Sequence, residues 1–367
     1  MTDGARPHLL RLTARIGSYI ATNQTADGAI PWQHGQVLDP WDHVEAAMGL
    51  SVAGLMEQAE AAYAWLARQQ HPDGGWWATY HPGRSEEHQT AEHRELHFVA
   101  YAATGVWHHF LVTQDRSFLE AMWTMVDRAL DWVVHHQGST GAMPWAVTQH
   151  GVVYDAALLT ANASILRSLH CGLTLAARLG MRRPAWRLAL ERLKKAMRHP
   201  WLFDANKRHF AMDWFYPIMA GLYAPQQAAQ CLLSRWHVFV VEGMGCRCLS
   251  HRPWITVAES AELAMALCAA GERAAALQLM RWLEAYQAAD GGYWMGYEVS
   301  HGCLWPEEKP TWTAGAVLLA YDALHDLTPA STLLTSDLRL EEQAGLASAE
   351  APQRPQRTRR RQGLEQS

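Results

Sequence analysis

The chain has 367 residues, of which 49% are hydrophobic, and a formal net charge of −5 at pH 7. A chain of this length can bury a large core, and a nearly balanced charge gives no reason to expect nucleic acid as a partner. The six cysteines show neither C-x-x-C spacing nor a disulfide pattern. No uncharged apolar run approaches about 18 residues, and residues 1–24 hold no apolar signal segment. We therefore expect a cytoplasmic protein without a transmembrane segment.

Apolar residues recur three and four positions apart along most of the chain, which is the spacing of helices with one buried face. Ala, Leu and Met dominate these stretches and β-branched alternation is almost absent, so we expect strands only as short pieces of loops. The predicted helices cover residues 6–24, 40–55, 57–70, 90–113, 116–136, 154–179, 184–198, 213–223, 225–236, 254–270, 272–288 and 310–325.

One motif occurs four times and marks the ends of helices. In its second copy Trp65 and Leu66 lie on the apolar face of a helix, Gln70 follows, and Gly74 and Trp76 close the motif. Gln can hydrogen-bond free carbonyls at a helix end, and Gly takes the positive φ that turns the chain. A motif repeated about every 50 residues is typical of a helical repeat array. The other copies are Tyr19-Ile20…Gln24…Gly28…Trp32, Trp132-Val133…Gln137…Gly141…Trp145 and Trp282-Leu283…Gln287…Gly291…Tyr293.

Antiparallel hairpins that bury one face against both neighbours can close into a ring, with alternate helices inside and outside. The sequence therefore predicts an all-α fold, an (α/α)6 toroid of six helical hairpins, with one domain over residues 1–327. Residues 328–367 lack aromatic residues and are rich in Ala, Glu, Gln and Arg, so we expect a disordered, Arg-rich tail.

Acidic, histidine and tryptophan side chains collect at the predicted starts of the inner helices. Sugar hydrolysis needs two carboxyl groups flanking the glycosidic bond, and flat aromatic rings with nearby polar groups suit sugar binding. We expect Glu298, Asp42 and Glu45 to be catalytic, because Glu298 follows a Gly-rich loop that a ligand can approach closely. The candidate substrate-binding residues are Trp41, His43, His93, His97, Asp155, Asp213, Trp214, Trp254, Glu259 and Trp312.

Two further patterns concern metals. Cys246, Cys248 and His251 offer groups that bind Zn²⁺, but their spacing is loose, and we expect neither a metal nor a cofactor. His93 and His97 are four residues apart on one helix face, which fits hydrogen bonding in a cavity wall, a proton relay or metal ligation.

The repeated motif resembles the QW repeat of triterpene cyclases, and Asp290-Gly291-Gly292-Tyr293 is similar to repeats of protein prenyltransferase β-subunits. Six-hairpin glycosidases, including glucoamylase-like enzymes, share the α/α-toroid architecture that this resemblance implies.

Two segments resemble the glycosidases in particular. Trp41-Asp42-His43-Val44-Glu45 is similar to the Trp-x-Arg-Asp stretch that positions a sugar. Tyr297-Glu298, followed by Thr311-Trp312-Thr313-Ala314, resembles the segment that carries their general-base Glu. Pro144-Trp145-Ala146-Val147 differs, because it has Ala where those enzymes carry a general-acid Glu.

These features favour a carbohydrate-active enzyme with glycosidase-like acid–base chemistry on a glycan or another small-molecule substrate. An isoprenoid cyclase or prenyltransferase is the alternative, although the chain contains neither an Asp-x-Asp-Asp nor an Asp-Asp-x-x-Asp sequence. A non-catalytic toroid that binds a glycan, lipid or protein is the third interpretation. The sequence leaves the oligomeric state open.

Overall fold

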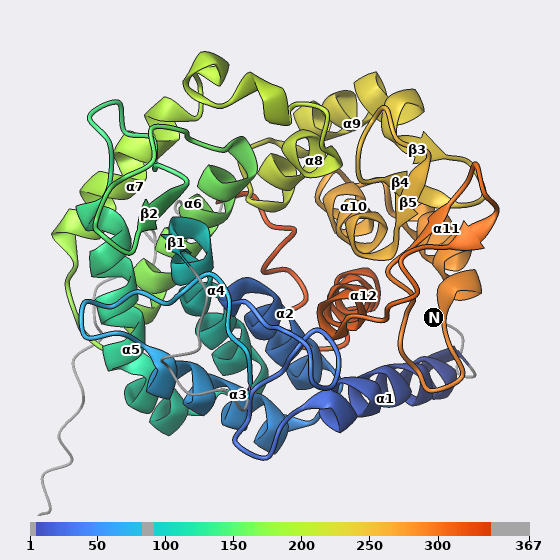
Figure 1. The fold of residues 1–367 in the computed structure, drawn as a ribbon, viewed down its shortest axis with the longest axis horizontal. Coiled ribbons are helices and arrows are strands. Elements are labelled where there is room, and N and C mark those ends of the chain that lie inside the picture. The colour runs from blue at the N-terminus through green and yellow to red at the C-terminus, as the bar shows by residue number, and fades with distance from the viewer. Residues whose placement is uncertain (1–4, 83–91, 339–367) are drawn as a thin grey trace, which may run out of the picture.

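The computed structural model describes residues 5–82 and 92–338, and its helices lie in a ring (Figure 1). Within these described residues, three short 3-10 helices lie between the longer ones: η2 (Pro200–Leu202), η3 (Ala205–Lys207) and η4 (Glu284–Tyr286). In the described part of the chain, no helix is long and apolar enough to cross a membrane. The α-helices are α1 (Ala5–Asn23), α2 (Pro40–Val52), α3 (Met56–Gln69), α4 (Leu96–Thr113), α5 (Arg116–His135), α6 (Leu159–Arg178), α7 (Pro184–Ala196), α8 (Ala211–Met219), α9 (Pro225–Phe239), α10 (Val257–Ala269), α11 (Arg273–Leu283) and α12 (Thr311–His325).

The even-numbered helices form a closed inner ring. Each packs on the next, from α2 through α4, α6, α8 and α10 to α12, and α12 packs on α2. The odd-numbered helices lie outside them (Figure 1). Inner helices approach closely where small residues face each other: a Cβ added to Gly315 of α12 would lie 2.8 Å from the carbonyl oxygen of Glu45 in α2. The predicted mostly helical toroid is confirmed.

Copies of the repeated motif fasten one outer helix to the next. At the end of α3, Gln70 Nε2 donates to the carbonyl of Gly74 in its own turn and to the carbonyl of Met125 in α5, both at 2.9 Å. Gly74 has a φ of +104°, which a residue with a side chain rarely adopts. The predicted structural role of the motif is therefore confirmed. The copies after α1 and α5 reach the next outer helix in the same way, at 2.9 Å, through Gln24 to Gln58 and Gln137 to Ala189.

Two small antiparallel sheets correct the all-α prediction. The first pairs β1 (His93–Glu95) with β2 (Ala146–Thr148). The second has five strands in chain order, β3 (Val240–Val241), β4 (Gly245–Arg247), β5 (Trp254–Thr256), β6 (Gly296–Glu298) and β7 (Cys303–Leu304). Strands β1 and β5 lead directly into α4 and α10, where helix was predicted. Their backbone groups bond across neighbouring loops instead of along a helix.

The segment at residues 328–338 is packed, which corrects the predicted start of the tail at residue 328. Arg167 Nη2 of α6 donates to the carbonyl of Ser336 at 2.6 Å, and Leu338 N donates to the carbonyl of Gly221 at 3.3 Å. Leu334 and Leu338 are buried, and Figure 1 shows this red segment crossing the middle of the ring. Residues 339–367 of the predicted tail lie outside the described residues.

Candidate active site

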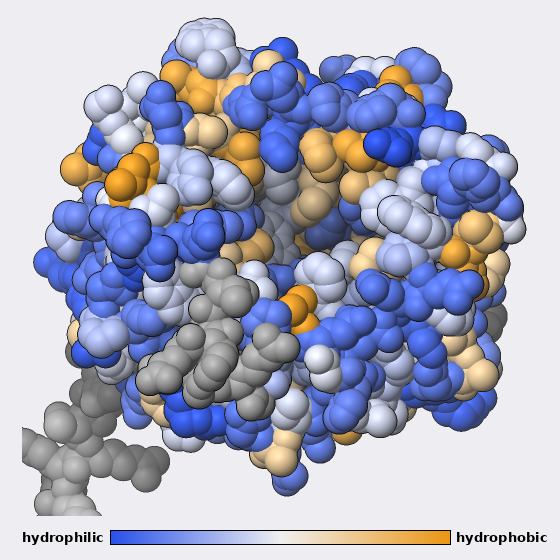
Figure 2. Space-filling view, viewed as in Figure 1, coloured by the Kyte–Doolittle hydropathy of each residue, from blue (hydrophilic) through white to orange (hydrophobic). Residues whose placement is uncertain are grey.

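A cavity opens where the inner helices begin. Figure 2 shows the hollow near the middle of this face, with hydrophobic and hydrophilic residues around it. Its volume is about 300 Å³, which lies within the range of small-molecule sites. Every inner helix contributes residues near its start. The lining residues are Trp41, Asp42, Glu45, His97, Phe98, Leu158, Thr160, Ala161, Lys207, Phe210, Met212, Asp213, Ala258, Glu259, Glu262 and Trp312.

Two pairs of carboxyl groups line different walls of this cavity. Asp42 and Glu45 lie one turn apart on α2, and Glu259 and Glu262 lie one turn apart on α10. Helix α12 packs between α2 and α10 in the ring, so the two pairs are separated. Residues three apart share a helix face, which explains why both members of each pair reach the cavity. Sequence reasoning missed Glu262, although its spacing from Glu259 repeats that of Asp42 and Glu45.

The surroundings of Asp42 raise the pKa of its carboxyl group. Asp39 caps α2, and its Oδ1 accepts a hydrogen bond from the backbone N of Asp42 at 2.9 Å while its Oδ2 accepts one from Trp32 Nε1 at 3.2 Å. Burial, together with the nearby charge of Asp39, raises the pKa of Asp42 well above its usual range. Two adjacent carboxyl groups cannot both ionise at low cost, so these surroundings favour the protonated form of Asp42.

The deeper pair of acids is buried as well. Trp41 Nε1 donates to Glu45 Oε2 at 3.0 Å, and Tyr101 OH donates to the same oxygen at 3.4 Å. Burial nevertheless raises the pKa of Glu45 to about 7. Burial, followed by repulsion from Glu45 and Glu259, raises the pKa of Glu262 well above its usual range. Burial therefore favours the protonated forms of both deeper carboxyl groups.

Three buried polar atoms in the cavity wall have no hydrogen-bond partner among the residues that the structure describes. They are Glu259 Oε2, His97 Nδ1 and Trp312 Nε1. A buried polar atom without a partner costs about 1–3 kcal/mol. Two of these atoms can accept hydrogen bonds and the third is a donor, and all three belong to residues that line the cavity.

Asp213 supplies a further carboxyl group, on α8. Its Oδ1 accepts hydrogen bonds from Thr160, at 3.2 Å from the backbone N and 2.7 Å from Oγ1. Burial raises its pKa above the ordinary value, and these hydrogen bonds oppose the shift. This acid also joins the start of α8 to the start of α6.

The structure brings together only part of the set of residues predicted from sequence. The cavity is lined by Trp41, Asp42, Glu45, His97, Asp213, Glu259 and Trp312. It is not lined by His43, His93, Asp155, Trp214, Trp254 or Glu298.

Two of the cavity predictions are wrong because the side chains belong to the protein interior. His43 is fully buried, its Nδ1 accepts a hydrogen bond from Ile30 N at 3.1 Å, and its Nε2 lies 3.0 Å from the carbonyl oxygen of Ala62. Trp214 stacks on Phe239 with ring centres 5.1 Å apart. Both residues lie on inner helices, but their side chains contact the outer helices α3 and α9 and not the cavity.

The remaining four residues lie on strands and loops outside the cavity lining. Glu298 is on β6, where its Oε1 accepts a hydrogen bond from Ser300 N at 3.2 Å, and the structure does not place it beside Asp42. Trp254 Nε1, on β5, donates to the carbonyl of Trp305 at 2.7 Å. Asp155 is exposed, and His93 Nε2 lies 3.2 Å from Glu95 Oε1.

The residues predicted as possible metal ligands do not form a metal site in the described part of the chain. Among residues 5–82 and 92–338, no cluster of three or more His, Cys, Asp or Glu side chains is arranged to hold one. Cys246 is buried, and burial raises the pKa of its thiol well above the ordinary value. His251 packs edge-on against His209, with ring centres 5.2 Å apart.

Comparison with solved structures supports the toroid. The fold matches a protein described as a wild-type glycosidase with a TM-score of 0.67 at 17% identity, over 90% of this chain and 100% of the other. It matches a D-mannose isomerase with a TM-score of 0.66 at 11% identity, over 88% and 98% of the two chains. A GH63 mannosylglycerate hydrolase from Thermus thermophilus gives 0.63 at 13% identity, over 84% and 99%. No protein-family model matches the sequence.

A sequence relative carries the assignment further. The chain is 42% identical over 324 residues, 88% of each protein, to the MMP endo-(1,4)-3-O-methyl-alpha-D-mannosidase of Mycolicibacterium hassiacum. With the toroid and its carboxyl-lined cavity, this relationship makes the protein a carbohydrate-active enzyme of the glycosidase-like α/α-toroid class. The chain belongs to the family of that endo-mannosidase. The isoprenoid alternative finds no support in these relatives.

Proposed function

We propose that this protein hydrolyses internal (1,4) linkages in chains of 3-O-methyl-α-D-mannose. The observation that carries the proposal is the 42% identity, over 88% of both chains, to an enzyme named for that reaction. The match extends over 324 residues, so it is not confined to one segment of the toroid.

The lining of the cavity is consistent with a methylated sugar. Carboxyl groups and unpaired donors and acceptors lie beside apolar side chains that come from several inner helices. A methyl ether cannot donate a hydrogen bond and gains from contact with apolar surface. The apolar contributors are Phe98, Leu158, Ala161, Phe210, Met212 and Ala258.

Asp42 is our candidate general acid, and Glu259 is our candidate general base. Burial and the nearby charge of Asp39 raise the pKa of Asp42, which favours the protonated form that a general acid needs. Glu259 stands on another wall of the cavity, and its Oε2 accepts no hydrogen bond from the described residues. We assign Glu45 and Glu262 to the support of this pair from one turn deeper.

The proposed reaction is a single displacement. Asp42 donates its proton to the glycosidic oxygen as the C1–O bond breaks. Glu259 takes a proton from the water molecule whose oxygen bonds to C1, so water is added across the linkage and two shorter chains are released. Such a reaction inverts the configuration at C1, and the first reducing end released from an α-linked chain would be the β anomer.

The test compares three variants on a synthetic oligomer of (1,4)-linked 3-O-methyl-α-D-mannose. Asp42→Asn and Glu259→Gln should each lower kcat at least about a hundredfold, because each removes one proton-transfer group. Glu298→Gln, the residue favoured by sequence reasoning, is the matched control and should retain most activity. A large loss of kcat in Glu298→Gln, with no loss in Glu259→Gln, would show that Glu298 and not Glu259 is the general base. The unmethylated oligomer tests whether the methyl group is recognised.

The proposal includes two features inferred from the sequence. We interpret the ring as six helical hairpins, supported by the inner and outer sets of helices that alternate along the chain. We also propose that hydrolysis takes place in the cytoplasm, which the six free cysteines support.

A further inference from the structure

His97, in the first turn of α4, forms part of the cavity wall. Its ring lies edge-on to Trp41, with ring centres 5.0 Å apart, and only 11% of its side chain is exposed. Its Nδ1 is buried and has no partner in the described part of the chain, whereas its Nε2 lies 3.5 Å from Glu95 Oε2. The two ring nitrogens of this histidine therefore have different surroundings.

Glu95 contacts His97 and is held in place by its other neighbours. It ends β1 and pairs in register with Ala146 of β2, so that Trp145 is close by. Trp145 Nε1 donates to Glu95 Oε2 at 2.8 Å, and His93 Nε2 lies 3.2 Å from Glu95 Oε1. Glu95 itself is absent from the cavity lining.

The contact with Glu95 favours one position for the hydrogen of His97. A carboxylate only accepts hydrogen bonds, so Glu95 Oε2, 3.5 Å from Nε2, favours the form that carries the hydrogen on that nitrogen. Burial lowers the pKa of His97, which keeps the ring neutral. A neutral ring with its hydrogen on Nε2 presents a bare lone pair at Nδ1, and such an atom binds an O–H or N–H group but not an ether oxygen.

We propose that Glu95 is a positioning residue that fixes the Nε2–H tautomer of His97, so that Nδ1 accepts a hydrogen bond from a free hydroxyl group of the bound sugar. The inference rests on the proposed function for the identity of the sugar. In a (1,4)-linked chain of 3-O-methylmannose, linkages occupy C1 and C4 and a methyl ether occupies C3. Only the hydroxyl groups at C2 and C6 can donate, so His97 recognises one of these.

The first test reads the tautomer and needs no substrate. Nitrogen NMR of the protein labelled with ¹⁵N-histidine, with His97→Phe used to assign the signal, should show Nδ1 of His97 without hydrogen at neutral pH. Glu95→Leu should give a mixture of tautomers. Glu95→Gln should preserve the wild-type form, because Trp145 can only donate and the substituted amide must therefore turn its carbonyl oxygen toward Trp145 and His97. Hydrogen on Nδ1 in the wild type, or an unchanged signal in Glu95→Leu, would overturn the proposal.

The second test reads recognition by steady-state kinetics. One of two substrate analogues, deoxygenated at C2 or at C6, should be cleaved by the wild type with kcat/KM lower by roughly tenfold, the value of one buried hydrogen bond. His97→Phe should lose that discrimination, and Glu95→Gln should retain it. Equal cleavage of both analogues and the parent oligomer by the wild type would exclude the hydroxyl contact.

The two tests separate this inference from the proposed function. If the wild type cleaves no methylated mannose oligomer but His97 shows the Nε2–H tautomer, the substrate assignment fails while the positioning role of Glu95 stands. If the oligomer is cleaved but the tautomer is reversed, the proposed function stands and this inference fails.

Discussion

Gly291, in the turn after α11, lies against the backbone of Arg15 in α1, so the last outer helix is joined to the first. A Cβ at Gly291 would lie 2.6 Å from the carbonyl oxygen of Arg15. Arg15 Nη2 also donates to the carbonyl of Ala288 in the same turn, at 3.0 Å. The fourth copy of the repeated motif therefore closes the outer ring, with the kind of contact that the other copies make between consecutive outer helices.

Replacement of this glycine tests the closure. Gly291→Ala should lower the free energy of unfolding in urea by about 1–3 kcal/mol more than Gly271→Ala does. Both glycines have positive φ, 96° and 82°, so both variants carry backbone strain. Only Gly291 has atoms in the way, because nothing lies within 4 Å of a Cβ at Gly271. Equal losses would mean that the contact with Arg15 adds nothing to stability.

The glutamine of the motif can be tested in the same assay. Gln70→Ala removes two hydrogen bonds of 2.9 Å, to Gly74 and Met125, and should cost about 1–3 kcal/mol because both carbonyls are left without this donor. Gln287→Ala provides the comparison, because the amide of Gln287 reaches the carbonyl of Gly291 only at 3.4 Å. We expect Gln287→Ala to lose less unfolding free energy than Gln70→Ala. A larger loss in Gln287→Ala would show that its longer hydrogen bond is the stronger of the two.

Truncation tests the packed C-terminal segment. A chain that ends at Leu327 should melt at a clearly lower temperature than the full chain. It loses four buried apolar side chains, Ala330, Leu333, Leu334 and Leu338, together with the contact between Arg167 and Ser336. A chain that ends at Leu338 is the control and should melt like the full chain, in keeping with the tail composition. Coincident melting curves for all three chains would restore the boundary predicted from sequence.

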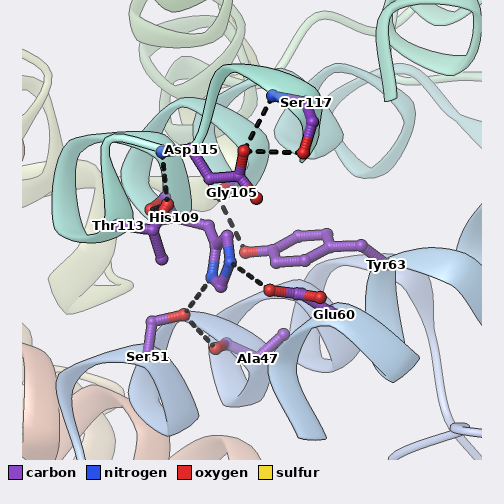
Figure 3. Close-up of polar contacts among 9 residues, drawn as sticks. All are labelled: Ala47, Ser51, Glu60, Tyr63, Gly105, His109, Thr113, Asp115 and Ser117. Carbon is purple, nitrogen blue, oxygen red and sulfur yellow. Dashed lines mark hydrogen bonds and ion pairs between the residues drawn. The ribbon is translucent and has the colours of Figure 1, made fainter. Parts of the chain in front are cut away.

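The buried position of His109 leads us to expect that the protein loses stability in acid. Figure 3 shows its ring between Ser51, whose Oγ lies 2.9 Å from Nδ1, and Glu60, whose Oε1 lies 3.6 Å from Nε2. The ring is fully buried, and burial lowers its pKa to about 4. Since the unfolded chain binds this proton near pH 6.5, unfolding takes up a proton between about pH 6.5 and pH 4. Stability is unaffected by this group above that window and is lost as pH falls through it.

The measurement is the free energy of urea unfolding at pH 7 and at pH 5. Between pH 7 and pH 5 the free energy of unfolding should fall less in His109→Gln than in the wild type. The difference should be about 1.4 kcal/mol for each pH unit below about pH 6.5. The exposed His150 gives a control variant, His150→Gln, whose pH dependence should match the wild type. An unchanged slope in His109→Gln would show that this histidine is not held neutral.

Local patterns in the sequence account for the helices and for their ends. The period of apolar residues places α5 and α7 within a few residues of their observed bounds, because each has one buried stripe that the period records directly. The Gln–Gly–Trp motif was recognisable for a similar reason, since its hydrogen bonds close within one turn and one neighbouring helix. The same signals place Asp42, Glu45 and Glu259 at helix starts.

The tertiary structure alone decides which of those helix-start residues share a cavity. His43 and Glu45 are two residues apart on α2, yet the first bonds to the backbone of α3 and the second faces the cavity, because a helix turns by about 100° per residue. On inner helices that are apolar all round, the sequence carries no period that distinguishes the two faces. The sequence also could not show that Glu262 lines the cavity and that Glu298 does not. Their positions depend on how β6 and α10 meet other segments of the ring, and such contacts between distant segments leave no local pattern.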